Sequence, residues 1–541
     1  MTEKNEKIMD FETALSSQIG KFGVYQFYNI GLLAVVGVAS AFMAGDYVFT
    51  GGRLPHRCLV PECEPPQTDF TTSWLPNAIP YDTQTGFDDC RRYPSVLNIT
   101  NTSVDGTSCP AHLFDTTRTV SCEAYVYDRN NTVVFDFGLP CQEWLRALPG
   151  TLNSLGGMVA LPLAGFISDY FGRRMSILIF TFNSATLGLI RAFSVNYPMY
   201  VALQFLQTAL GGGGYSAAYI LATEIVSPEY RVPTSATMSS SFALGQVFMG
   251  LIAMAVYEWR SISIALYAPM FIIVLSYGFI LTESHRWLLS KNKNEQAKTT
   301  IKKAAWLNRR KIDDASVENL ITAFNSGPKP DYSEINEESL FKRILKSPIM
   351  LRRCLTTPVW WACTTFVYYG LSINSVRLSG NMYHNYVLTA GAEVPGYWLA
   401  VLLLQRLGRR STLLAGYVTC AACCACVALL PAPWAAPRLA VYLVGKCSIA
   451  LVFTSLYLAT SELYPTRHRH SLLGWSSMVG RVGSVLAPLT PPLARYSAPL
   501  PALLFAAAAL LCAALVLTQP ETKGAKLPNT IEEAEMIGRN K

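Results

Sequence analysis

The chain has 541 residues, of which 51% are hydrophobic and 15% are charged. Soluble domains carry about 25% charged residues, so this composition excludes an ordinary soluble protein. The formal net charge of +8 is compatible with nucleic-acid binding, but the positive residues follow the loops of a membrane protein, as described below, and we expect no nucleic-acid partner.

Residues 1–21 mix lysines with acidic residues and lack the apolar core of a cleavable signal peptide. We expect a cytoplasmic N-terminus, followed by a first membrane helix that acts as an uncleaved signal. Twelve apolar runs follow, each close to the ~20 residues with which a helix crosses the hydrocarbon. They predict an all-α membrane protein with twelve transmembrane helices in two six-helix halves, 22–282 and 354–518. The runs are 22–49, 148–168, 175–193, 198–222, 234–256, 261–282, 354–373, 383–404, 411–430, 437–460, 471–494 and 499–518.

A polar insertion, residues 50–146, separates the first two predicted helices. Thiols oxidise and glycans are added outside the cell, so we expect an extracellular, glycosylated loop with three disulfides. Six cysteines allow fifteen pairings, and the sequence leaves the pairing open. The cysteines are Cys58, Cys63, Cys90, Cys109, Cys122 and Cys141, and the Asn-x-Ser/Thr sequons begin at Asn98, Asn101 and Asn130.

Positive charge distinguishes the two sides of the predicted membrane. Residues 283–353 alone hold fifteen Lys and Arg, whereas the short loops of the opposite side hold one arginine each. This positive-inside bias places the linker 283–353, with its short helices, and the tail 519–541 in the cytoplasm. We therefore expect a multi-pass protein of the plasma membrane, surrounded by lipid, with both termini cytoplasmic.

Two short patterns occur twice in the chain. Parallel repeats about an axis normal to the membrane build one large class of secondary transporters, so the recurrence predicts a duplicated half. Gly172, Arg173 and Arg174 recur as Gly408, Arg409 and Arg410 at an offset of 236 (408 − 172), and Glu224 and Arg231 recur as Glu462 and Arg469 at an offset of 238 (462 − 224).

The first copy belongs to the pattern Gly165-x3-Asp169-x2-Gly172-Arg173-Arg174. Asp169 can pair with Arg173 across one helical turn, and such a charged clasp can hold two helices together in one state and release them in another. The pattern resembles the signature loop of the major facilitator superfamily. Gln405 stands where the superfamily usually has Asp, so we expect a weaker clasp in the second half.

Three further stretches resemble solute carrier family 22, the organic cation, carnitine and organic anion transporters. The resemblance covers nearly the whole chain and includes the six-cysteine loop. It implies a polyspecific carrier for small organic ions that works by alternating access, with substrate bound between the halves near the midplane. It implies no enzymatic activity, no cofactor and no metal centre. The stretches are Glu283-Ser-His-Arg-Trp-Leu-Leu-Ser290, Glu462-Leu-Tyr-Pro-Thr466 with Arg469, and Pro520-Glu-Thr-Lys-Gly524 with Leu527-Pro-Asn-Thr-Ile531.

Glu393, Lys446 and Arg481 lie inside predicted membrane helices, where ionisable residues are costly and are candidates for function. In the family, cation carriers resemble this chain at Glu393 but have Asp at the position of Arg481, whereas anion and carnitine carriers resemble it at Arg481. Anion carriers usually have Lys at the position of Tyr397. We hypothesise that Arg481 holds a substrate carboxylate while Glu393 faces an amine or quaternary nitrogen. The alternative is that Glu393 pairs with Lys446 or Arg481 as a structural ion pair.

Two aromatic residues complete the predicted substrate site. Trp361 and Tyr368 are seven residues apart and share one helical face, and they match pocket-lining positions of the family. Aromatic faces attract quaternary ammonium groups. The sequence therefore predicts a carrier of organic cations or zwitterions such as carnitine, and leaves a coupling ion and the oligomeric state open. The alternatives are an organic anion exchanger and, in another class, a receptor or adhesion glycoprotein that does not transport.

Overall fold

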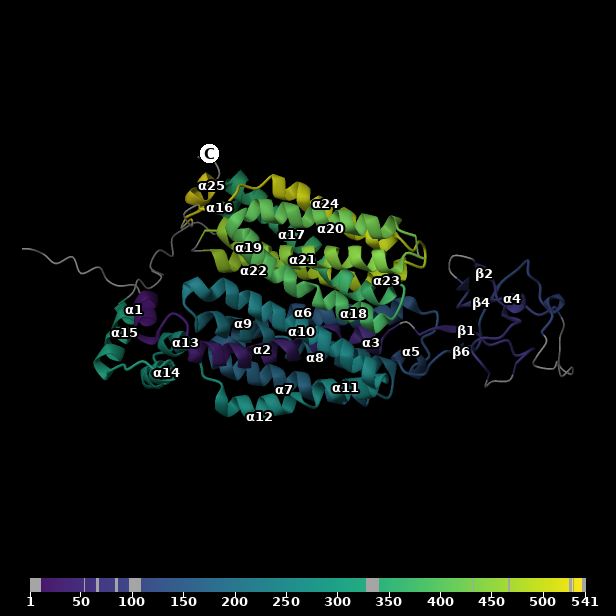
Figure 1. Cartoon of the computed structure of the whole chain (residues 1–541), viewed down its shortest axis with the longest axis horizontal. Helices are drawn as coiled ribbons and strands as arrows, with labels where there is room; N and C mark the ends of the chain where they lie inside the picture. Colours follow the sequence, from purple (N-terminus) through teal and green to yellow (C-terminus); the bar gives the residue numbers. More distant parts are fainter. Residues whose placement is uncertain are drawn as a thin grey trace, which may run out of the picture.

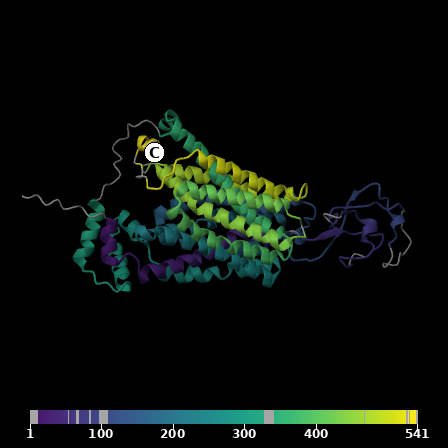
Figure 2. The same cartoon turned by 45° about the horizontal axis from the view of Figure 1, so that its top comes forward.

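The computed structural model describes residues 11–52, 54–64, 68–82, 86–96, 109–326, 340–431, 433–465, 468–524, 528 and 530–537. A long helical bundle forms the centre of the molecule (Figure 1). A cysteine-rich segment lies at one end of it, which we call the domain end. Short helices lie at the other end, which we call the linker end, and the view in Figure 2 keeps the same order.

The first half of the bundle contains the helices between residues 24 and 280. Most are apolar along their whole length, as helices that face both lipid and neighbouring helices must be. They are α2 (Val24–Gly45), α3 (Tyr47–Thr50), α6 (Glu143–Phe171), α7 (Arg173–Ala192), α8 (Tyr197–Gly211), α9 (Gly214–Glu224), η2 (Pro228–Tyr230), α10 (Arg231–Val256), α11 (Trp259–Tyr267) and α12 (Met270–Ile280).

The second half lies beside the first (Figure 1). It contains α17 (Pro348–Asn374), η3 (Ser375–Arg377), α18 (Met382–Gly391), α19 (Glu393–Arg406), α20 (Arg409–Leu429), α21 (Ala435–Leu463), α22 (Arg469–Leu486), η4 (Ala487–Leu489), α23 (Thr490–Leu493) and α24 (Leu500–Leu517).

All twelve predicted spans are helical. Five are interrupted: 22–49 at Asp46, 198–222 near Gly212, 261–282 near Pro269, 383–404 at Ala392, and 471–494, which divides into α22, η4 and α23. Within the described ranges, nine helices are long and apolar enough to cross a membrane. The other three predicted spans fall in α8 with α9, in α17, and in α22 with η4 and α23.

The two halves are packed together at the domain end. Helix α10 packs against α18 and α19, and α6 packs against α22. Added Cβ atoms at Gly150 and Gly250 would lie 2.9 Å from Pro488 and 2.7 Å from Val387. Ser154 also donates a hydrogen bond to the Ser484 carbonyl across 2.9 Å. The structure therefore has the halves closed against each other at this end.

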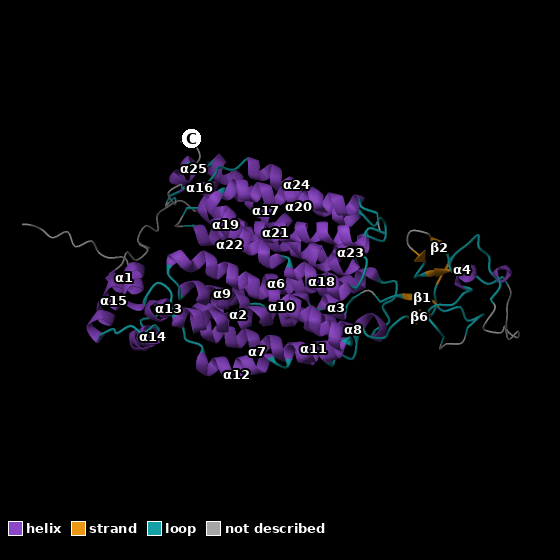
Figure 3. Ribbon diagram, viewed as in Figure 1, coloured by secondary structure: helices purple, strands orange, loops and turns teal. Residues whose placement is uncertain are grey.

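The cysteine-rich segment between α3 and α6 is the part of the described chain that contains strands (Figure 3). Three disulfides fix its pairing as Cys58–Cys122, Cys63–Cys109 and Cys90–Cys141. Asn130 is exposed, whereas the sequons at Asn98 and Asn101 lie outside the described residues. The elements are β1 (His56–Cys58), α4 (Leu75–Ala78), β2 (Tyr81–Asp82), β3 (Gly86–Phe87), β4 (Arg91–Arg92), η1 (Ala111–Leu113), β5 (Val120–Ser121), β6 (Tyr125–Tyr127) and α5 (Val133–Asp136), with β1 paired to β6, β2 to β3 and β4 to β5.

The short helices of the linker end divide between the two halves. Helices α1 (Phe11–Ile19), α13 (His285–Ser290), α14 (Asn294–Leu307) and α15 (Asp314–Ser326) share an apolar core with the first half. Helices α16 (Leu340–Lys346) and α25 (Ile531–Met536) pack on the second half, where Arg353 of α17 donates to the Ala534 carbonyl across 2.7 Å. Each half thus carries its own cap, and the linker joins the two caps.

Candidate functional site

Glu393 and Lys446 form a buried ion pair in the second half. Glu393 is the first residue of α19, immediately after the break that separates α18 from α19. Lys446 lies near the middle of α21. The Lys446 Nζ is 2.9 Å from Glu393 Oε1, and both side chains are fully buried. Two opposite charges taken out of water in this way stabilise each other only when their remaining donors and acceptors are also satisfied.

Those remaining groups are satisfied. The hydroxyls of Tyr368 and Tyr397 donate to Glu393 Oε2 across 2.5 Å and 2.9 Å. Gln246 of α10 reaches the same carboxylate from the first half, with Nε2 3.4 Å from Oε2. Lys446 also donates to the Tyr368 carbonyl across 2.9 Å and to Ser372 Oγ across 2.7 Å. In this conformation, both charges are held by the protein itself.

Aromatic rings extend from this pair towards the linker end. The Lys446 Nζ lies 3.7 Å from the centroid of the Tyr368 ring, and that ring lies 5.0 Å from Phe453. Phe453 contacts Tyr457, which meets Trp361 edge to face at 4.4 Å. Trp361 is buried and donates to Thr460 Oγ1 across 3.2 Å. The predicted aromatic residues therefore form one wall, built from α17 and α21.

Arg481 of α22 lies beside this wall and is half-buried. Its guanidinium lies near the Tyr457 phenol. Within the described residues, it makes no hydrogen bond or ion pair with a carboxylate. The structure thus brings Tyr368, Glu393 and Lys446 into one network and connects Trp361 and Arg481 to it through Tyr457 and Phe453.

A second buried ion pair, in the first half, was missed by sequence reasoning. Arg191 of α7 pairs with Asp46, the residue between α2 and α3, and both are fully buried. Tyr267 donates to Asp46 Oδ2 across 2.7 Å, and Gln204 lies 3.4 Å from Oδ1. Both charged residues fall inside predicted spans, so the rule that selected Glu393 applied equally to them.

The first repeated motif forms a network at the linker end. Arg173 binds Asp169 across 2.9 Å, as the motif predicts, and also binds Glu224 across 3.1 Å. The backbone N–H groups of Arg173 and Arg174 donate to Glu283. The carboxylate therefore caps the positive end of α7. Burial raises the pKa of Glu283 above its ordinary value, and these N–H groups oppose the rise.

The second motif forms a matching network with a different distribution of partners. Arg409 binds both oxygens of Glu462, at 2.8 and 2.9 Å, and Glu521 accepts from the N–H groups of Arg409 and Arg410. Burial by itself raises the pKa of Glu521. The hydrogen bonds that backbone N–H groups donate to the carboxylate lower the pKa more, so it lies below its ordinary value. Gln405 stands where the first half has Asp169, and the contact of Arg409 with both oxygens of Glu462 offsets the loss of that carboxylate.

Glu283 and Glu521 belong to the stretches that resemble solute carrier family 22, but those stretches do not indicate their role as helix caps. Their offset of 238 (521 − 283) equals that of Glu224 and Glu462, so the repeat itself could have identified them. Glu224 pairs with Arg173, and Glu462 pairs with Arg409. Arg231 and Arg469 begin α10 and α22, and Nε and Nη2 of Arg469 have no hydrogen-bond partner in the part of the chain that the structure describes.

Comparison with known proteins agrees with this architecture. The profile of the Major Facilitator Superfamily matches residues 145–488. The mouse organic cation/carnitine transporter 2 is 31% identical over 534 residues, covering 95% of this chain and 92% of that protein. The rat solute carrier family 22 member 7 is 30% identical, covering 97% and 98%, and the mouse solute carrier family 22 member 3 is 29% identical, covering 98% and 96%.

Solved structures share the fold. The inward open conformation of the xylose transporter XylE from E. coli is 16% identical, with a TM-score of 0.57, over 74% of this chain and 90% of that chain. A partially occluded inward open conformation of the same transporter also has a TM-score of 0.57, at 14% identity, over 93% of this chain and all of that chain. At these identities, the likeness concerns the twelve-helix architecture alone.

Proposed function

Because this chain belongs to solute carrier family 22 within the major facilitator superfamily, we propose that it is a secondary carrier of small zwitterions or organic cations, with carnitine-like zwitterions as its best-fitting substrates. It is not an enzyme. The observation that carries the substrate class is Arg481. Apart from Arg438 at the edge of one span, five charged residues lie within the predicted spans. Asp46, Arg191, Glu393 and Lys446 pair with each other, whereas Arg481 has no carboxylate partner within the described residues.

The charges of the site support a substrate that carries a carboxylate. Glu393 and Lys446 cancel, so Arg481 gives the site one unbalanced positive charge. A guanidinium binds a carboxylate with two parallel hydrogen bonds. The rings of Tyr368 and Trp361 in the aromatic wall beside it can bind a quaternary or amine nitrogen once transport exposes them, because here both are buried and Lys446 lies over the Tyr368 ring. A zwitterion uses both features, and a simple cation uses only the wall.

The same unbalanced charge favours an organic anion as the second candidate. An anion would bind Arg481 without needing the aromatic wall. However, Tyr397 stands where the anion carriers of the family usually have Lys. The tyrosine donates to Glu393 instead of adding a second positive charge. This difference supports the zwitterion over the anion.

We further propose that the domain end faces the cell exterior, with both termini and the two caps in the cytoplasm of a plasma-membrane protein. The disulfides and the exposed sequon at Asn130 support this orientation, as do the fifteen basic residues of 283–353. Transport then consists of opening the closed domain end while the linker end closes, with the paired charges remade around the substrate.

Uptake into vesicles containing the full chain tests the proposal. Labelled carnitine, tetraethylammonium and p-aminohippurate represent the zwitterion, the cation and the anion, and each is measured with and without sodium. We expect saturable carnitine uptake that exceeds the other two. Uptake of p-aminohippurate alone would establish the anion carrier instead, and correctly inserted protein with no saturable uptake of any of the three would support the non-transporting receptor.

A further inference from the structure

The Cys90–Cys141 disulfide has surroundings that distinguish it from the other two. It lies where the cysteine-rich domain meets both halves of the bundle. Cys141 is two residues before α6 of the first half, and Arg495 approaches from the loop between α23 and α24 of the second half. The Arg495 Nη2 lies 2.8 Å from the Cys90 Sγ. One sulfur of this disulfide therefore carries a permanently charged guanidinium as its neighbour.

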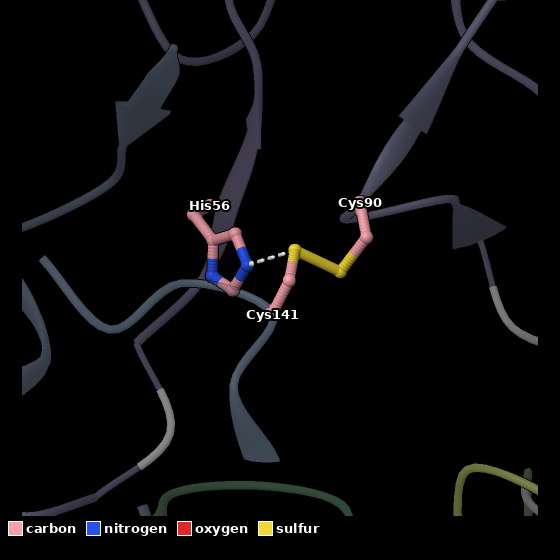
Figure 4. A group of neighbouring side chains, drawn as sticks. All are labelled: His56, Cys90 and Cys141. Carbon is pink, nitrogen blue, oxygen red and sulfur yellow. Dashed lines mark hydrogen bonds between the residues drawn. A yellow bond between two sulfur atoms is a disulfide. The ribbon is translucent and has the colours of Figure 1, made fainter. Parts of the chain in front are cut away.

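The other sulfur faces a histidine (Figure 4). The Nε2 atom of His56 lies 3.5 Å from the Cys141 Sγ. The Nδ1 atom of the same ring lies 2.8 Å from the Leu54 carbonyl oxygen. A carbonyl oxygen only accepts, so Nδ1 carries the hydrogen, and Nε2 of the neutral ring presents its lone pair to Cys141. The ring is held in place by β1, which pairs with β6, and by the ring of Tyr125 at 5.7 Å.

We propose that Cys90–Cys141 is a thiol-exchange site, which small thiols open in preference to the other disulfides of the domain. Exchange is faster when the leaving thiolate is stabilised, and neighbouring cations lower the pKa of a thiol. Arg495 stabilises a leaving Cys90 thiolate, and the basic Nε2 of His56 can accept the proton of a Cys141 thiol. Among the described residues, no guanidinium or imidazole forms a hydrogen bond with a sulfur of the other two disulfides; the Arg57 guanidinium beside Cys58 donates to the Cys58 carbonyl and to Glu64.

The steps balance with two thiols as the reductant. One thiolate attacks the Cys141 Sγ, the bond between Cys90 and Cys141 breaks, and Cys90 leaves as a thiolate beside Arg495. A second thiolate then attacks the outer sulfur of the mixed disulfide on Cys141, which releases the oxidised small disulfide and a Cys141 thiolate. The two protons of the consumed thiols end on the two cysteines, the Cys141 proton shared with His56.

A cavity large enough for a small thiol lies next to this disulfide and is lined by its neighbours His56 and Asp89, although neither cysteine lines it. It measures about 460 Å³ and lies between the domain and the two halves, with His56 and Asp89 on the domain side and Tyr47, Arg146 and Arg377 on the bundle side. Cys90 and Cys141 are both partly exposed, whereas Cys63 and Cys109 are buried, as is Cys58 of the third pair. Geometry and access therefore select the same disulfide.

Opening this disulfide would release the domain from the start of α6. Cys141 has a positive φ of 61°, a backbone conformation that a non-glycine residue rarely adopts. Because the halves close against each other at this end, the site connects the redox state of the surroundings to the end of the bundle that must open during transport.

Timed alkylation of the purified full-length protein tests the proposal. The protein is exposed to a graded series of dithiothreitol, free thiols are trapped with a maleimide, and each cysteine is quantified by mass spectrometry. We expect Cys90 and Cys141 to be labelled first, and Arg495→Gln to slow their opening roughly three- to tenfold. His56→Gln is expected to slow it as well. The control Arg118→Gln removes another exposed arginine, which pairs with Asp115 and has no hydrogen bond to a cysteine among the described residues.

Two results would overturn the proposal. One is that Cys90–Cys141 opens no earlier than Cys58–Cys122 or Cys63–Cys109. The other is that Arg495→Gln opens at the wild-type rate. Neither depends on transport, so the outcome is independent of the proposed substrate class.

Discussion

In the part of the chain that the structure describes, each half of the bundle has one fully buried ion pair, but the two pairs are connected to the rest of the molecule differently. Asp46 and Arg191 are bound by Tyr267 and Gln204, all within the first half. Glu393 and Lys446 belong to the second half, but the carboxylate also accepts from Gln246 of the first half. A movement between the halves leaves the first pair unchanged and must break the Gln246 contact. Burial alone therefore does not distinguish a structural brace from a group that participates in transport.

The two cations, Arg191 and Lys446, also differ in the hydrogen-bond partners that they have besides the paired carboxylate. Arg191 has no hydrogen-bond partner for Nε or Nη1 within the described residues, so Asp46 is its main support. Lys446 retains the Tyr368 carbonyl and Ser372 Oγ even without Glu393. The first pair is therefore expected to control stability more strongly, and the second pair to control transport.

The largest expected effect follows from breaking the first pair. Asp46→Asn leaves the Arg191 charge buried without compensation, which costs about 3–5 kcal/mol of unfolding free energy. Thermal unfolding in detergent measures the loss. Glu229→Gln is the control, because both side chains of its pair with Lys21 are more than 60% exposed, and such exposed pairs contribute little to stability. Equal melting temperatures for the two variants would contradict the role of Asp46 as a brace.

Breaking the second pair tests the other side of the comparison. Lys446→Met leaves Glu393 with the hydroxyls of Tyr368 and Tyr397, so we expect a smaller loss of unfolding free energy, about 3 kcal/mol, at the low end of the range for breaking a buried pair. Saturable uptake should fall more than it does in a stability-matched variant of the first half. A stability loss larger than that of Asp46→Asn, together with unchanged uptake, would contradict the assignment of the first pair to stability and of the second pair to transport.

The contact that connects the halves has a smaller expected effect. Gln246→Leu removes a long hydrogen bond between the halves worth about 1 kcal/mol. The equilibrium between halves that are closed and halves that are separated at the domain end then shifts towards separation by about fivefold. Maleimide labelling of a cysteine introduced by Ser154→Cys reports this opening. Gln207→Leu is the control, because Gln207 donates within the first half to Ser184. The idea fails if both variants label at the same rate.

The smallest effect concerns the repeated motifs. Gln405→Asp restores in the second half the pair that Asp169 makes with Arg173, and Asp169 is 76% exposed. One exposed pair of this spacing contributes about 0.3–0.5 kcal/mol. The melting temperature should rise slightly, with Asp169→Gln giving the opposite change. A large change in either variant would mean that the clasp depends on Asp169 more than on Glu224.

Much of the architecture could be predicted from the sequence, because apolar runs and the positive-inside rule follow directly from the bilayer. The breaks at Gly212 and Ala392 could not, since helix breaks at membrane depth depend on neighbouring helices. The candidate site was predicted as a set of residues but not as a network. Nothing in the positions of Glu393, Lys446 and Arg481 specifies which cation pairs with the carboxylate, because that depends on how α19, α21 and α22 are rotated.

The most direct test of the account is uptake by Arg481→Gln, with Arg438→Gln as the matched control at the edge of the bundle. The account predicts that Arg481→Gln lowers labelled carnitine uptake roughly tenfold or more, the loss expected for one charge-assisted pair, and leaves tetraethylammonium uptake at or above its wild-type rate. Carnitine uptake equal to that of the control variant would contradict the role of Arg481 as the carboxylate-binding group.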